Sequence, residues 1–335
     1  MELGIFTFAD VVADPVTGDA PTPARRLRDV VDLAVLADDG GLEVFGVGEH
    51  HRRDFAVTSP AVVLGAVATR TRRLRLTSAV TVLSSADPVR VFEDFTTVDL
   101  LSDGRAEILA GRGAFIESFP LYGADPADYE ALFDEKIDLL LRLTRDETVT
   151  WSGRFRPALD HQPVFPRPVQ PRLPVGVGVG GSPASFLRAG RLGLPITIGI
   201  VGGRPEALAP HVVDYRAAAE RAGHDAAALP VALTAHAFVA RTSQEAGDVF
   251  YPRYAAMAEL AGRSLSREQF DRARGLDGHL VVGSPAEVTE KLLHQQEIFG
   301  HQRFLAQIPH GPLPHKDAMR AVELLGADVA PHLAP

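Results

Sequence analysis

The 335-residue sequence contains no cysteine, and this absence excludes disulfide bonds, thiolate metal sites and a cysteine nucleophile. It also lacks any run of lysine and arginine, and its formal net charge is −9, so nucleic acid is not expected as a partner. No apolar run reaches the roughly 18 residues of a membrane span, and the first residues lack the basic and apolar segments of a signal peptide. We therefore expect a cytoplasmic protein without membrane association.

Eight short apolar segments alternate with stretches that have helical spacing. Hydrophobic residues make up 46% of the chain and charged residues 23%, which is enough to form a sizeable core. The expected strands are residues 3–8, 42–48, 74–82, 105–110, 173–179, 195–201, 230–239 and 303–308. A doubly wound sheet usually stops at about five to seven strands, so this alternation predicts an α/β fold of the (β/α)8 TIM-barrel type.

Residues 147–171 interrupt this alternation. The segment holds prolines at positions 157, 163, 166, 168 and 171, too many for a central strand. Because the strand–helix rhythm resumes directly after it, we interpret the segment as an insertion with a short hairpin. The chain is then expected to form a single barrel domain over residues 1–335.

The segment Glu49-His50-His51 directly follows the second expected strand. In a parallel α/β fold, the loops after the carboxyl ends of strands carry the active site. Along an extended segment alternate side chains share a direction, so Glu49 and His51 are expected to point one way and His50 the other. A histidine here can move a proton near neutral pH. The spacing lacks the His-Glu-x-x-His pattern of a metal site, so no metal is expected.

Residues 176–181 form a Gly-x-Gly-x-x-Gly pattern between a strand and a helix. A dinucleotide site also needs an acidic residue at the end of the next strand, and none occurs there. Gly180 and Gly181 would let a ligand approach the backbone, while Ser182 and Ser185 lie in the first helical turn, which favours an anion such as phosphate. The alternative is an ordinary tight turn with a capping serine.

Arg112 lies between two glycines at the end of the fourth expected strand. A guanidinium at this position suits bidentate contact with a phosphate. The alternative is a surface ion pair.

Several motifs occur in one order over about residues 40–125 and together resemble the luciferase-like flavin monooxygenases. They are Glu49-His50-His51, Ser78-Ala79-Val80, Ala86-Asp87-Pro88-Val89-Arg90, Leu101-Ser102-Asp103-Gly104-Arg105 and Gly111-Arg112-Gly113. Gly180-Gly181-Ser182 and the eight strand–helix units extend the resemblance to nearly the whole chain.

The resemblance implies a barrel that uses reduced FMN and O2 to oxidise a small organic substrate, with a separate flavin reductase as partner. It implies a catalytic role for His50, supported by Glu49 and His51. It assigns the FMN phosphate to Arg112, Gly180, Gly181, Ser182 and Ser185, and it places a non-proline cis peptide beneath the flavin at Ala79-Val80. A homodimer is expected from the family alone.

Position 111 departs from the light-emitting members of the family, which carry a reactive cysteine where this chain has Gly111. Bioluminescence is therefore not expected, while flavin binding is. A deazaflavin-dependent dehydrogenase on the same barrel and a non-catalytic flavin-binding partner subunit remain alternatives. His161 and His310 are further candidates for the pocket, and an aromatic wall is expected from Phe6, Phe8, Phe115, Phe119 and Tyr122.

Overall fold

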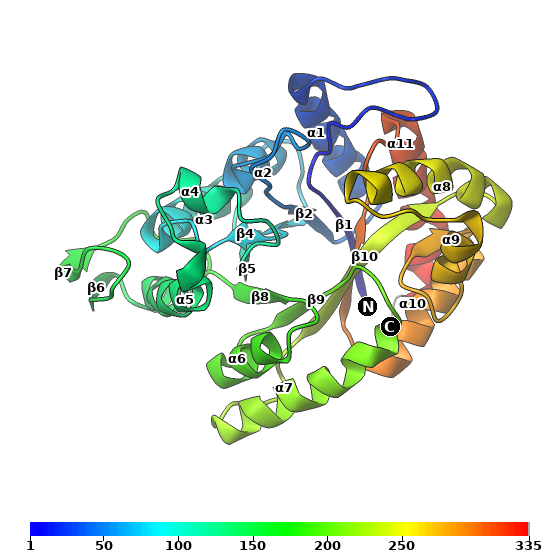
Figure 1. Cartoon of the computed structure of the whole chain (residues 1–335). Helices are drawn as coiled ribbons and strands as arrows, with labels where there is room; N and C mark the ends of the chain where they lie inside the picture. The colour runs from blue at the N-terminus through cyan, green and yellow to red at the C-terminus, as the bar shows by residue number, and fades with distance from the viewer. Residues whose placement is uncertain (334–335) are drawn as a thin grey trace.

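The computed structural model describes residues 1–333 and contains a closed barrel of eight parallel strands surrounded by helices (Figure 1). The barrel strands are β1 (Glu2–Thr7), β2 (Val44–Val47), β3 (Arg75–Ser78), β5 (Ala106–Gly111), β8 (Val175–Val179), β9 (Ile196–Ile200), β10 (Val231–Val239) and β12 (Arg303–Gln307). Neighbouring strands pair in this order, and β12 pairs with β1 to close the ring. The predicted (β/α)8 barrel is confirmed.

The main helices around the barrel are α1 (Pro23–Asp39), α2 (Pro60–Ala68), α3 (Pro88–Ser102), α5 (Tyr129–Arg145), α6 (Pro183–Leu192), α7 (Ala209–Arg221), α8 (Ser243–Leu260), α9 (Arg267–Arg274), α10 (Pro285–Phe299) and α11 (His315–Leu324). Proline in the first turn starts many of them, since its fixed φ suits that position and its missing N–H needs no partner there. Asp87 caps α3 by accepting hydrogen bonds from two backbone N–H groups. Ser59 occupies the corresponding position of α2 without a capping hydrogen bond.

The segment after α5 forms an antiparallel hairpin of β6 (Thr148–Trp151) and β7 (Leu159–Pro163) outside the barrel (Figure 1). This agrees with the predicted insertion. Trp151 anchors it, because its side chain is buried and its indole N–H donates to Asp138 on α5 at 3.0 Å.

One expected strand is divided in the structure, and one short strand lies outside the eight barrel strands. The strand expected over residues 74–82 is divided into β3 and β4 (Thr81–Val82), and the Ala79–Val80 peptide between them is cis. β11 (Val281–Gly283) pairs only with the carboxyl end of β10, so it lies beyond the closed ring. Short helical segments complete the described chain: α4 (Ser118–Leu121), η1 (Pro126–Asp128), η2 (Pro205–Leu208), η3 (Leu325–Val329) and η4 (Ala330–His332).

The largest apolar core lies between the strands and the helices and includes Leu33, Phe45, Leu76 and Phe304. A second, smaller cluster of Phe6, Val44, Ala79 and Leu305 fills the barrel interior. At the amino ends of the strands, Arg303 forms ion pairs with Glu2 and Glu107. The cavity described below lies at the opposite, carboxyl end of the barrel. Among residues 1–333, no helix is long and apolar enough to cross a membrane.

Candidate functional site

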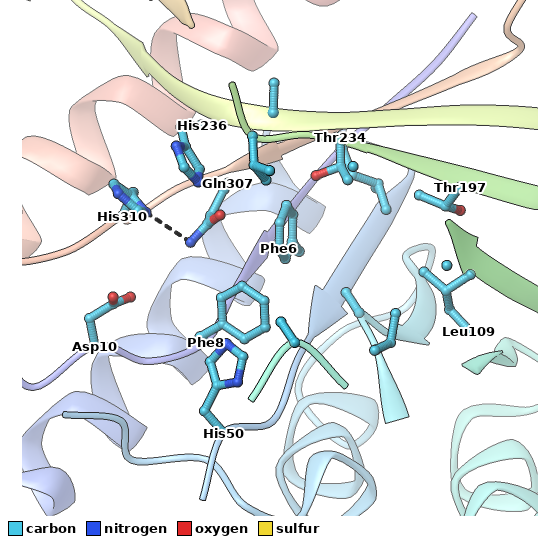
Figure 2. Close-up of a pocket in the computed structure, with 18 of the residues that line it drawn as sticks. Phe6, Phe8, Asp10, His50, Leu109, Thr197, Thr234, His236, Gln307 and His310 are labelled. Atoms are coloured by element: carbon cyan, nitrogen blue, oxygen red, sulfur yellow. Dashed lines mark hydrogen bonds between the residues drawn. The ribbon is translucent and has the colours of Figure 1, made fainter. Parts of the chain in front are cut away.

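A cavity of about 380 Å³ opens at the carboxyl ends of the barrel strands (Figure 2). It is lined mainly by residues that lie on or after β1, β2, β3, β5, β8, β9, β10 and β12. Most of the lining is apolar, and among the described lining residues none is lysine or arginine. The cavity therefore suits an uncharged, largely apolar ring system.

Aromatic rings form one wall of the cavity. Phe8 stacks on the imidazole of His50 with ring centroids 4.3 Å apart, and Phe55 and Phe115 approach the same imidazole at 4.5 Å and 4.7 Å. Phe6 meets Phe8 edge to face at 5.6 Å. Of the five aromatics predicted for this wall, Phe6, Phe8 and Phe115 line the cavity.

The other two predicted aromatics lie elsewhere. Phe119 is buried and stacks on Tyr129 at 5.7 Å, so it is part of the core. Tyr122 is exposed and lies beside His51, with 5.5 Å between ring centroids. Both belong to the loop and short helix after β5. The sequence alone does not indicate which face of this segment points toward the cavity.

His50 is the one residue of the Glu49-His50-His51 segment that lines the cavity. Burial, together with the nearby charge of Arg52 and His51, lowers its pKa to about 4. The imidazole is therefore neutral at pH 7, so one ring nitrogen can accept a proton and the other can donate one.

Glu49 and His51 point together, away from His50. Glu49 Oε1 accepts a short hydrogen bond from the backbone N–H of Val82, and its Oε2 lies 3.5 Å from His51 Nε2. Neither side chain lines the cavity. Glu49 connects the loop after β2 to strand β4, and its contact with His51 holds the segment on either side of His50.

The cis peptide Ala79–Val80 occupies the floor of the cavity, and both residues line it. The Val80 side chain fits between two strands only because each presents a glycine. A Cβ at Gly111 would lie 2.4 Å from Val80 Cγ2, and a Cβ at Gly178 would lie 2.7 Å from Val80 Cγ1. The glycine at position 111 is thus required by its packing against Val80.

Arg112 and Ser185 meet beside the cavity, one after β5 and the other in the first turn of α6. Arg112 Nη2 donates to the Oγ of buried Ser185 at 2.8 Å. The exposed carboxylate of Glu130 bridges Arg112 and Arg188. Of the two alternatives for Arg112, the ion pair is present with Glu130, and the phosphate contact stays a prediction.

Open space surrounds the turn that precedes α6. A Cβ added at Gly180 or Gly181 would meet no atom within 4 Å, and Ser182 makes no side-chain capping hydrogen bond. The turn before α6 is therefore open, and the Arg112 guanidinium lies at the first turn of the same helix. This combination fits the phosphate of a bound nucleotide cofactor.

Four polar side chains lie together at another side of the cavity, called here the polar end (Figure 2). They are Asp10, His236, Gln307 and His310. The Nε2 of Gln307 lies 3.0 Å from His310 Nδ1, and the imidazoles of His310 and His236 stack at 3.9 Å. His310 was a candidate from sequence. The other three were missed, although each lies at or near the carboxyl end of a barrel strand, which was the available signal.

His161 does not reach the cavity. It lies exposed on β7 of the hairpin, and its backbone N–H donates to Thr150 on β6. Within residues 1–333, no group of three or more His, Asp or Glu side chains is arranged to hold a metal ion.

The site thus combines a largely apolar cavity, a neutral histidine and an open turn before α6 beside a guanidinium. The family model described as luciferase-like monooxygenase matches residues 1–302, and the chain belongs to this family.

The related proteins include a monooxygenase and a dehydrogenase. Over 202 residues, 59% of this chain and 58% of the relative, the sequence is 30% identical to N-acetyl-S-alkylcysteine monooxygenase of Bacillus subtilis. It is 31% identical to F420-dependent glucose-6-phosphate dehydrogenase of Amycolatopsis mediterranei over half of each chain, 50% and 51%.

Solved structures share the fold over the whole chain. Monooxygenase RslO1 of Streptomyces bottropensis superposes with a TM-score of 0.85 at 25% identity, covering 100% of both chains. The oxygenating constituent of 3,6-diketocamphane monooxygenase from Pseudomonas putida, in complex with FMN, gives a TM-score of 0.77 at 20% identity, covering 99% of this chain and 98% of that one.

Proposed function

We propose that the protein is an FMN-dependent monooxygenase that uses reduced FMN and O2 to oxidise a small organic substrate. The observation that carries the proposal is the Arg112–Ser185 contact at the open end of α6, next to an apolar cavity that holds a neutral histidine. The FMN complex of the Pseudomonas putida monooxygenase, which has the same fold, supports the choice of FMN.

Each group has a defined task in this proposal. Arg112, Ser182, Ser185 and the glycines at 180 and 181 hold the phosphate. Ala79 and Val80 support the ring system from below. Reduced FMN, when bound, supplies the electrons that activate O2.

Proton handling falls to His50, whose imidazole lies in the cavity and is neutral at pH 7. A ring nitrogen of His50 donates or accepts the proton that oxygen transfer requires. Glu49 and His51 act on this histidine indirectly as positioning residues. The surrounding phenylalanines exclude water from the reaction.

Reduced FMN is supplied by a separate flavin reductase in this proposal, because the sequence has no conventional nicotinamide site. We propose a homodimer as the working form, on the basis of the family resemblance.

Cofactor binding and oxygen uptake test the proposal together. Purified protein is titrated with oxidised FMN, reduced FMN and deazaflavin F420, and oxygen consumption is then followed with each reduced cofactor. We expect FMN to bind and oxygen to be consumed with reduced FMN.

The F420-dependent relative makes a deazaflavin dehydrogenase the second candidate. Binding of F420 in preference to FMN, without oxygen uptake, would favour that function. FMN binding with no substrate-dependent turnover would favour a non-catalytic flavin-binding subunit.

A further inference from the structure

The polar end of the cavity contains a buried carboxyl oxygen without a hydrogen-bond partner. Asp10 is 1% exposed, it lines the cavity, and its Oδ2 has no partner among the described residues. An unpaired buried polar atom is costly unless a ligand or water completes its hydrogen bonding. Its place in the lining indicates that the missing partner comes from the cavity.

The remaining groups of the polar end supply neutral hydrogen-bond donors and acceptors. Burial lowers the pKa of His310 to about 4 and that of His236 well below its usual value, so both imidazoles are uncharged at pH 7. Because Gln307 Nε2 donates to His310 Nδ1 in this arrangement, the proton of the neutral His310 ring lies on Nε2. His236 Nδ1 is held 3.2 Å from the hydroxyl of Tyr254.

The charge of the cavity restricts what can bind. Burial raises the pKa of Asp10 to about 7, although the positive charge of the nearby Arg26 acts to lower it. This carboxyl is therefore largely protonated below neutral pH and can donate a hydrogen bond. No lysine or arginine is present among the described lining residues to neutralise an anion. An anionic substrate would therefore leave its charge unpaired, and a neutral oxygen is favoured.

We propose that the polar end is the substrate-recognition site, and that it binds the hydroxyl or carbonyl oxygen of an uncharged aromatic or alicyclic substrate. The substrate's apolar body packs against the phenylalanine wall, and its oxygen pairs with Asp10 and His310. The proposal rests on the proposed function and adds to it the class of substrate.

The experiment compares two ligands that differ only in the hydrogen-bonding group. The FMN-loaded protein is titrated with 2-naphthol and with 2-methylnaphthalene, following the absorbance of bound FMN and the fluorescence of the naphthalene ring. We expect 2-naphthol to bind about tenfold or more tightly, since a well-formed buried hydrogen bond is worth roughly that factor. The anion 2-naphthoate should bind more weakly than either.

Two variants assign the preference to the polar end. His310→Phe keeps a flat ring for stacking on His236, and Gln307→Leu keeps the approximate volume. Each should reduce the naphthol preference to about twofold or less while FMN affinity stays within about twofold of the native value. His332→Phe, at an exposed site beside the amino ends of the strands, is the matched control and should keep the full preference.

The proposal is wrong if the native protein binds both ligands with equal affinity, or if the preference for 2-naphthol is unchanged in both variants. It is also wrong if the variants lose FMN affinity together with the preference for 2-naphthol, because the polar end would then belong to the cofactor site. Failure of the native protein to bind FMN would instead contradict the proposed function. The naphthalene fluorescence titration then still measures the preference on the cofactor-free protein.

Discussion

The imidazole of His50 lies among three aromatic rings, and this environment sets its protonation state. Because its pKa is lowered to about 4, the ring remains neutral across the physiological range. Its chemistry should therefore not switch near pH 6.5, where an exposed histidine titrates. A pH profile of activity should show no inflection from this residue between pH 5 and pH 8, about the range over which His50 stays uncharged.

His50→Ala should preserve FMN binding and lower turnover by about 10²- to 10⁴-fold, the usual contribution of a positioned acid or base. The measurement is substrate-dependent oxygen consumption, with the FMN dissociation constant determined separately by fluorescence quenching. His332→Ala is the control. Native turnover in the His50 variant would remove this histidine from the mechanism.

The close packing of Gly111 against Val80 should affect the stability of the protein. A Cβ at position 111 would lie 2.4 Å from Val80 Cγ2, so a larger residue must displace the valine. Gly111→Ala should lower the free energy of unfolding by about 1–3 kcal/mol, the usual cost of overpacking. Denaturant unfolding measures the change.

Shortening the opposing side chain tests the cause of that loss. Val80→Ala removes the methyl group nearest to the added Cβ, so in the Gly111→Ala background it should restore part of the lost stability. Additive losses in the double variant would show that the two positions do not interact.

At the scale of elements, strand β5 and helix α6 bring Arg112 and Ser185 together from positions 73 residues apart in sequence. Arg112→Ala should weaken FMN binding by about 10- to 100-fold, as expected for loss of a hydrogen bond to a charged group. Riboflavin, which lacks the phosphate, should bind the variant and the native protein equally. An unaltered FMN dissociation constant would exclude Arg112 from the phosphate site, and an equal loss for riboflavin would indicate a general structural defect.

The order of the elements could be predicted from sequence because prolines and glycines mark their ends. Pro88 and Pro183 start helices, and Gly193 and Gly300 end them in the left-handed conformation. The division of the third strand could not be predicted from periodicity, since residues 74–82 contain no proline or glycine to mark an interruption. The family motif at Ala79-Val80 predicted the cis peptide that lies between β3 and β4, and it did not predict the division itself.

Only part of the candidate site could be predicted from the sequence. Residues next to one another in a motif, such as Glu49-His50-His51, were identified, and the alternation rule gave the opposite directions of His50 and its neighbours. Asp10, His236 and Gln307 come from separate strands and carry no local motif, so only the closed barrel reveals that they face one cavity.

At the scale of the whole molecule, buried neutral histidines make stability depend on pH. His301 is 1% exposed, and burial, with a smaller contribution from the N-terminal ammonium, lowers its pKa from 6.5 to about 4. Since the unfolded chain binds the proton first as pH falls, stability is lost between pH 6.5 and about 4 and is unaffected by this group above pH 6.5.

Between pH 7.5 and pH 5, the free energy of unfolding should therefore fall by about 2 kcal/mol less in His301→Leu than in the native protein. Urea unfolding at the two pH values measures it, with His332→Leu as the exposed control. A variant that loses as much stability on acidification as the native protein would contradict the assignment.

The proposed cofactor-phosphate site and the polar end arise from different parts of the chain. Arg112 and Ser185 come from the segments after β5 and β8, whereas the polar end is formed by Asp10 and His310, after β1 and β12, and by His236 and Gln307, within β10 and β12. Under the proposed function, substitutions at the polar end can redirect the protein toward a new substrate while the residues assigned to the cofactor phosphate stay unchanged. Directed evolution for a new substrate should accordingly begin at positions 10, 236, 307 and 310, because changes there leave the phosphate contacts intact.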